Sequence, residues 1–180
     1  MALPKNYKEP DTSNYMRLKQ GENKFRILSD IIVGMEYWKD DGDRRTPIRK
    51  RPNEKIDIND LELDKEGQKV MPKHFWAMVV WNYDSEKIQI LELTQSTIRR
   101  KLAGLERNKD WGDLRDYDIT VTRDGVGFDT TYDTTQSPKT KVDEGIVQFY
   151  KDMNIDLEAL YEGDDPFKNS GDIDPEEVKV

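Results

Sequence analysis

The feature that most constrains the fold is a pair of apolar segments that flank a short polar turn. Residues 74–83 read HFWAMVVWNY and residues 87–93 read KIQILEL, with Asp84 and Ser85 between them. Runs rich in β-branched and aromatic residues on either side of a two-residue turn predict an antiparallel β-hairpin. This is the clearest local signal in the chain, and it places the protein in the mainly β class.

Further segments set the order of elements around this hairpin. Residues 24–38 (KFRILSDIIVGMEYW) predict a long strand, and Gly34 predicts a bend in its middle. The charged residues 39–72 include several glycines and prolines and predict a long loop. A helix is expected over roughly 95–107, where apolar residues recur with helical spacing. A second hairpin is expected over 117–132, around an Asp-Gly turn signal.

A bent strand, a long loop, a hairpin, a helix and a second hairpin follow one another as in the OB-fold. We therefore expect a five-stranded OB-fold barrel with a helix between strands 3 and 4, although another small β-barrel of the SH3-like kind would share parts of this order. OB-folds bind oligonucleotides on the strand 2–3 face and with loops L12 and L45. Here L12 would be long, and L45 would consist of Asp124-Gly125 alone. The expected parts are an N-terminal arm (1–23), the OB domain (24–140), a short helical extension (141–161) and a flexible, disordered acidic C-terminal tail (162–180).

Charge is distributed unevenly along the chain. The net charge is −8, and the last 40 residues carry 4 basic and 12 acidic side chains, so the whole excess lies there. Residues 44–55 carry six basic side chains against one acidic side chain. A basic segment combined with an acidic tail is typical of a nucleic-acid binder whose tail competes for the basic segment.

Single-strand binding needs cations that contact phosphates and aromatic side chains that stack on bases. The basic segment supplies the candidate phosphate contacts Arg44, Arg45, Arg49, Lys50 and Arg51. In the predicted hairpin Ala77 lies opposite Glu92, and because a buried unpaired carboxylate is costly we expect this face to point outward. The candidate stacking residues are therefore Phe75, Trp81 and Tyr83, with Tyr37 and Trp38 at the mouth of L12.

Three alternatives to this exposed aromatic face stay open. The N-terminal arm or a helix within 144–161 would cover the face, and a one-residue slip of the hairpin would exchange its two faces. Tyr37 and Trp38 would serve equally well as core residues. The face expected to point inward carries Trp76, Met78, Val80, Leu91 and Leu93.

Several kinds of chemistry have no support in the sequence. The chain has no cysteine and one histidine, so it cannot form a disulfide framework or a multi-histidine metal site. It lacks a P-loop and the common hydrolase motifs, so we expect no enzyme and no cofactor. A metal-dependent nuclease is a weaker alternative, using Asp116, Asp118, Asp129 and Asp133. No apolar run matches a membrane span or a signal peptide, which favours a cytoplasmic protein without membrane contact.

The chain resembles the phage and prophage single-stranded DNA-binding proteins with an OB core. The resemblance rests on KFRILSDIIVG (24–34), KHFWAMVVWNY (73–83), IQILELTQSTI (88–98) and YDITVTRDGVGFDTTY (117–132). It implies a replication or recombination accessory protein that coats exposed strands and binds partner proteins through an acidic tail, with self-association left open. A protein-interaction adaptor that does not bind DNA is the alternative.

The tail carries a motif of its own. Asp164, Asp165, Pro166 and Phe167 resemble the acidic tip of bacterial single-stranded DNA-binding proteins, which docks partner proteins. The motif departs from that pattern because 13 residues follow Phe167. The resemblance therefore implies a partner-binding site at these four residues, without the terminal carboxylate of the bacterial tip.

Overall fold

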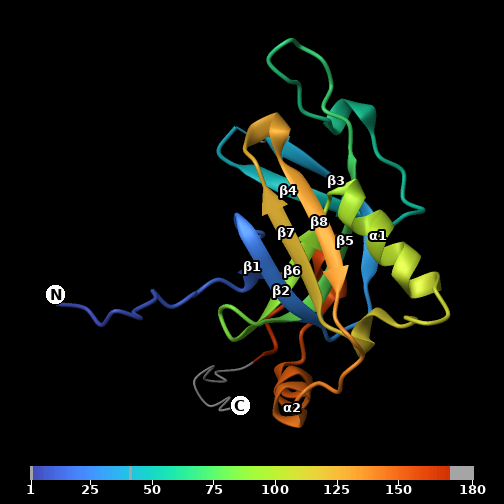
Figure 1. The fold of residues 1–180 in the computed structure, drawn as a ribbon. Coiled ribbons are helices and arrows are strands. Elements are labelled where there is room, and N and C mark those ends of the chain that lie inside the picture. Colours follow the sequence, from blue (N-terminus) through green and yellow to red (C-terminus); the bar gives the residue numbers. More distant parts are fainter. Residues whose placement is uncertain (1, 41, 171–180) are drawn as a thin grey trace.

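The computed structural model describes residues 2–40 and 42–170, and these form a mainly β protein, as predicted (Figure 1). The strands are, in chain order, β1 (Tyr15–Met16), β2 (Gly21–Ile27), β3 (Ile32–Asp40), β4 (Arg45–Lys50), β5 (Lys73–Asn82), β6 (Lys87–Leu93), β7 (Ile119–Asp124) and β8 (Thr131–Gln136). The α-helices are α1 (Ser96–Arg107) and α2 (Glu144–Met153). Short 3-10 turns are η1 (Ile58–Asp60), η2 (Leu114–Asp116), η3 (Gly127–Asp129) and η4 (Leu157–Glu162).

The strands form one mixed sheet rather than a closed five-stranded barrel. Its path runs β1-β6-β5-β2-β7-β8, with β3 paired to β5 and β4 paired to β3. The neighbours are antiparallel except β1 and β6, which pair in parallel. Within the described part of the chain no pairing joins β8 to β1, so the sheet stays open along that seam. Figure 1 shows α1 on one side of the sheet and α2 at one end of it.

The long first strand is bent, but not where the sequence predicted. β2 and β3 are separated by residues 28–31, and both pair with β5, through Phe25 with Asn82 and through Ile32 with Ala77. Gly34 lies inside β3, opposite Phe75. The predicted bend at Gly34 is therefore wrong, and the glycine has another role.

Gly34 allows a close approach of β4 and β5 to β3. A Cβ atom built on Gly34 would overlap the carbonyl oxygen of Lys50 and lie 2.9 Å from Cε1 of Phe75. These neighbours are a strand backbone and a fully buried ring, and neither moves freely.

Gly34→Ala is expected to lower the free energy of unfolding by about 1–3 kcal/mol, because overpacking forces the strands apart. Gly104→Ala is the control, since Gly104 lies within α1 and its added Cβ would meet open space. That change should stabilise the protein by up to about 1 kcal/mol, the difference in helix propensity. Urea unfolding of both variants measures the contrast, and equal stabilities would contradict the close approach.

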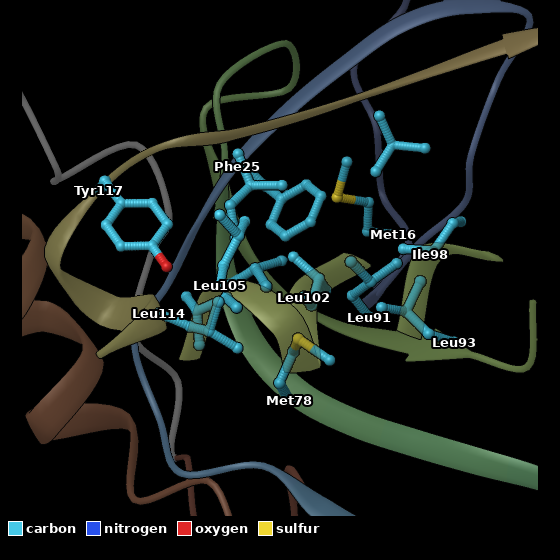
Figure 2. Packing of buried hydrophobic residues seen from close by; sticks show 14 residues of the cluster. Met16, Phe25, Met78, Leu91, Leu93, Ile98, Leu102, Leu105, Leu114 and Tyr117 are labelled. Atoms are coloured by element: carbon cyan, nitrogen blue, oxygen red, sulfur yellow. The ribbon is translucent and has the colours of Figure 1, made fainter. Parts of the chain in front are cut away.

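The central hairpin has the predicted register. Trp81 pairs with Ile88 and Ala77 pairs with Glu92. One face of the hairpin packs into a first core beneath α1, as predicted for Met78, Val80, Leu91 and Leu93, with Trp76 partly buried against them. Figure 2 shows this cluster, in which side chains from β2, β5 and β6 meet those of α1 and the segment that leads into β7.

The other face of the hairpin packs into a second core. Residues 142–170, called here the C-terminal cover, lie over this face through α2, η4 and the turn that follows. The buried members of the second core are Phe75, Ala77, Val79, Trp81, Ile88, Ile90, Ile146, Leu157, Leu160 and Phe167. The strands β5 and β6 are thus buried on both faces.

Neither helix of the described chain is long and apolar enough to cross a membrane.

Candidate nucleic-acid interface

The basic segment expected to form a loop is largely a strand. β4 pairs with β3 along its whole length, with Arg45 opposite Asp40 and Pro47 opposite Trp38. Arg45 lies over the ring of Trp38, with its guanidinium carbon 4.4 Å from the ring centroid. It also donates hydrogen bonds to both carboxylate oxygens of Glu62, and these lower the pKa of Glu62. The exposed Arg45 and the half-buried Trp38 therefore form a cation–π pair at the free end of this hairpin.

Arg49 is held inside the protein rather than offered to a phosphate. It donates to both carboxylate oxygens of Glu92, at 2.9 and 3.1 Å, and lies 3.4 Å from Glu36. Its side chain is only 13% exposed. Burial raises the pKa of Glu36, and Arg49 opposes that shift. Because withdrawing Arg49 would leave two carboxylates partly buried and unpaired, it is a structural ion pair.

The end of the basic segment is neutralised by the C-terminal cover. Arg51 donates to Glu54, Glu158 and Glu162, and its guanidinium lies 4.6 Å from the centroid of the Tyr161 ring. Lys50 lies 3.7 Å from Glu54. Arg44 is exposed just before β4. Among the predicted phosphate contacts, Arg44 and Arg45 are exposed, although Arg45 already pairs with Glu62. Arg49, Lys50 and Arg51 are less exposed and are also engaged by carboxylates.

The aromatic face expected to point outward is covered. Phe75 and Trp81 are buried in the second core, and Tyr37 is buried as well. The alternative that residues within 144–161 cover this face is the correct one. The prediction failed because Glu92 was treated as an unpaired charge, whereas Arg49 from the distant β4 neutralises it.

The cover is too well packed to be displaced by a strand of DNA. Each large apolar side chain buried in the second core contributes about 1.5–3 kcal/mol. A base that stacks on one exposed ring returns about 1–3 kcal/mol. Opening would expose apolar side chains on both the hairpin and the cover, while a stacked base would cover only one of these surfaces. Phe75 and Trp81 are therefore core residues.

Tyr83 lies at the edge of the second core and is half-buried. Its hydroxyl donates to a carboxylate oxygen of Asp118 at 2.7 Å. Burial, followed by this hydrogen bond, raises the pKa of Tyr83 to about 12, so the phenol stays protonated at ordinary pH. The Lys24 ammonium lies 4.9 Å from the ring centroid. Tyr83 is thus engaged by Asp118 and Lys24 and does not offer a free ring face for base stacking.

The described part of the acidic tail is packed rather than disordered. Phe167 is 8% exposed in the second core and meets the ring of Tyr15 edge-on. The carboxylate of Asp165 accepts from the amide of Phe167, and the carbonyl of Pro166 accepts from the amide of Asp156. Asp164 and Asp165 stay exposed. The expectation of disorder is therefore wrong for residues 162–170, and residues 171–180 lie outside the described residues.

The four aspartates of the nuclease alternative do not gather into a metal site. Asp118 is engaged by Arg26, Lys24 and Tyr83. Among residues 2–40 and 42–170 no group of three or more His, Cys, Asp or Glu side chains is placed to hold a metal ion.

The connection between β7 and β8 carries a surface feature that sequence reasoning missed. Phe128, in η3, is fully exposed, and Val126 beside it is 79% exposed. The Asp-Gly signal suggested a two-residue turn, but the connection spans residues 125–130 and β8 begins at Thr131. The available signal was the Gly-Val-Gly sequence, because Gly125 and Gly127 both adopt positive φ.

Comparison with known proteins gives one informative match. The chain is 24% identical over 144 residues to a curated protein of Escherichia phage T5 named "Probable ssDNA-binding protein". The match covers 70% of this chain and 56% of the T5 protein, so the chain spans just over half the length of that relative. No family model matches the chain, and no solved structure matches it significantly. The similarity to a phage protein of this kind confirms the resemblance seen in the sequence.

Proposed function

We propose that this chain binds single-stranded DNA with little sequence preference, in the handling of exposed strands during phage DNA replication or recombination. The name of the T5 relative supports the ligand. The same proposal holds that the protein binds DNA without catalysing a reaction.

The arrangement of strands supports an OB-type domain. β2 and β3 together act as one bent first strand that pairs with β5 along both of its halves, and β2 also pairs with β7. The hairpin β5–β6, the helix α1 and the hairpin β7–β8 then follow in OB order. In that order the β3–β5 connection corresponds to L12 and the β7–β8 connection to L45, the two loops that grip oligonucleotides in OB-folds.

The observation that carries the proposal is the full exposure of Phe128 on the L45 equivalent. An aromatic ring in this position contributes nothing to the core, but it offers both faces to a base. The Trp38–Arg45 pair supplies a second, half-buried ring at the end of β3 and a cation in the L12 equivalent. We propose that Phe128, Trp38, Arg44 and Arg45 contact the strand.

Phe128→Ala is expected to weaken binding of a dT oligomer about 5- to 150-fold, the loss of one stacked base. The stability of the fold should stay within about 0.5 kcal/mol of wild type, because the ring is exposed. Fluorescence anisotropy and thermal unfolding measure the two quantities. Val126→Ala, at the exposed neighbour, is the control, and equal affinities for both variants would contradict a stacking role for Phe128.

The acidic C-terminal region supports a regulatory part of the proposal. Glu158 and Glu162 engage Arg51 with the kind of charge-assisted hydrogen bonds that phosphates would make. We propose that carboxylates of this region compete with DNA for the basic hairpin and that its exposed acidic side chains also recruit replication or recombination proteins.

A further inference from the structure

The open seam of the sheet contains a groove with a distinctive charge. It lies between β1 with the turn that follows it, β6, and the β7–β8 hairpin, and it has a volume of about 620 Å³. Its walls include Arg17, Lys19, Arg123, Glu92, Leu91 and Tyr132. This volume is within the range of about 300–1,000 Å³ that is usual for ligand clefts. We call it the seam groove.

The seam groove is net positive in a strongly acidic chain. Glu92 is the acidic residue of its lining and is already paired with Arg49. Arg17 is exposed and has no carboxylate within salt-bridge distance in the described structure, and Lys19 has only Asp84 at 3.8 Å. Two other grooves have more acidic than basic residues in their linings. The positive charge is therefore a property of this groove and not of the surface in general.

Arg123 and Tyr132 form one wall of the groove and are direct partners across β7 and β8. Arg123 donates from Nη1 to the carbonyl of Leu18, while its Nε is buried and has no hydrogen-bond partner. Tyr132 is half-buried against the first core, so its ring orientation is supported by packing. With both side chains supported in this way, the arginine can bind a phosphate and the neighbouring ring can stack on a base.

The groove is continuous with the proposed DNA site. The hairpin that carries Phe128 at its tip carries Arg123 and Tyr132 along its strands. The β1–β2 turn reaches the base of that tip, where the Gln20 side chain contacts Asp124. A strand stacked on Phe128 would therefore meet Arg123, Tyr132 and Arg17 as its next contacts.

We propose that the seam groove is a binding site for single-stranded DNA, with Arg17, Lys19 and Arg123 on the phosphates and Tyr132 stacked on a base. This inference rests on the proposed function and extends it, because it places part of the strand outside the L12 and L45 equivalents and away from the covered hairpin face.

The test compares two charge-reversal pairs with wild type, using a labelled dT oligomer and a duplex of equal length over a range of salt. Arg17→Glu/Lys19→Glu is expected to weaken single-strand binding at least about tenfold at low salt. It should also reduce the slope of the logarithm of the binding constant against the logarithm of the salt concentration by about 1.4, since each lost phosphate contact contributes about 0.7. Lys101→Glu/Lys109→Glu changes the net charge equally at exposed lysines that lie outside the groove and outside the L12 and L45 equivalents, and it should keep the wild-type slope.

Equal losses of affinity in both pairs of variants would contradict DNA binding in the seam groove, because the change in net charge alone would then explain both losses. Wild-type binding by Arg17→Glu/Lys19→Glu would also overturn it and would leave the proposed function standing. If the wild type did not bind the single strand, or bound the duplex equally well, both the proposed function and the proposed site in the seam groove would be contradicted.

A second pair of variants tests the base contact. Tyr132→Leu is expected to weaken binding about 5- to 150-fold, and Tyr132→Phe should bind like wild type because it retains the ring. Thermal unfolding of both variants separates lost stacking from lost packing. If Tyr132→Leu and Tyr132→Phe had equal stability and equal affinity for the oligomer, Tyr132 would not stack on a base.

Discussion

Replacing Asp118 with alanine is expected to lower the free energy of unfolding by about 3–5 kcal/mol, because it removes the partner of a buried charge. Arg26 is 1% exposed, and its Nη1 lies 3.1 Å from Asp118. Its remaining donors are satisfied by the carbonyls of Arg115 and Thr140 and by the Thr140 hydroxyl. Urea unfolding followed by circular dichroism measures the loss.

The control is Asp133→Ala, which removes an exposed aspartate from the neighbouring strand β8 and should change stability by no more than about 0.5 kcal/mol. A double variant, Arg26→Met/Asp118→Leu, should recover most of the loss, since replacing both members of a buried pair with apolar residues is often neutral. A loss below about 1 kcal/mol for Asp118→Ala would contradict the buried network.

The second large effect is expected at the cover. Phe167→Ala should lower the free energy of unfolding by about 3–5 kcal/mol, the usual effect of emptying a buried phenylalanine site. It should not tighten DNA binding, because the hairpin face beneath Phe167 is core and not a blocked binding site. Thermal unfolding and anisotropy with a dT oligomer measure both quantities on the same protein.

Lys168→Ala is the matched control for Phe167→Ala, since Lys168 is the exposed next residue. A Phe167→Ala protein with wild-type stability and tighter DNA binding would contradict our account. It would mean instead that the cover is a displaceable lid, as expected of a tail that lies over an exposed aromatic face.

The elements with local signals were predictable from sequence. The hairpin register followed from its turn, because a turn of fixed length sets every cross-strand pair. The helix α1 followed from the spacing of Ile98, Leu102 and Leu105, which are all buried. The mainly β class followed from the same apolar runs.

The elements that depend on distant partners were not predictable. The sequence predicts a loop at β4 because this segment carries Pro47 and three basic residues, Arg45, Arg49 and Lys50. β4 is nevertheless an edge strand, and an edge strand tolerates a proline. The sequence left the cover of the second hairpin face open as an alternative and could not decide for it, because the ion pair of Glu92 with Arg49 joins two strands far apart in the sequence.

The proposed binding site differs from the one that the sequence predicts for a related reason. Sequence position alone located the positive charge at residues 44–55, but the fold brings Glu62, Glu92, Glu158 and Glu162 against that segment. Arg17 and Arg123 are far apart in the sequence and lie together only because the turn after β1 and the β7–β8 hairpin border one seam. A groove formed by distant residues leaves no run of charge in the sequence.

The most direct test of the central claim is the titration of wild-type protein with a dT oligomer and with a duplex of equal length at several salt concentrations. Single-strand binding rests on phosphate contacts and base stacking, so we expect saturable binding that weakens as salt rises. The duplex, whose bases are already stacked in pairs, should bind far more weakly. Absence of single-strand binding at low salt, or equal affinity for both ligands, would contradict single-stranded DNA binding as the function of this protein.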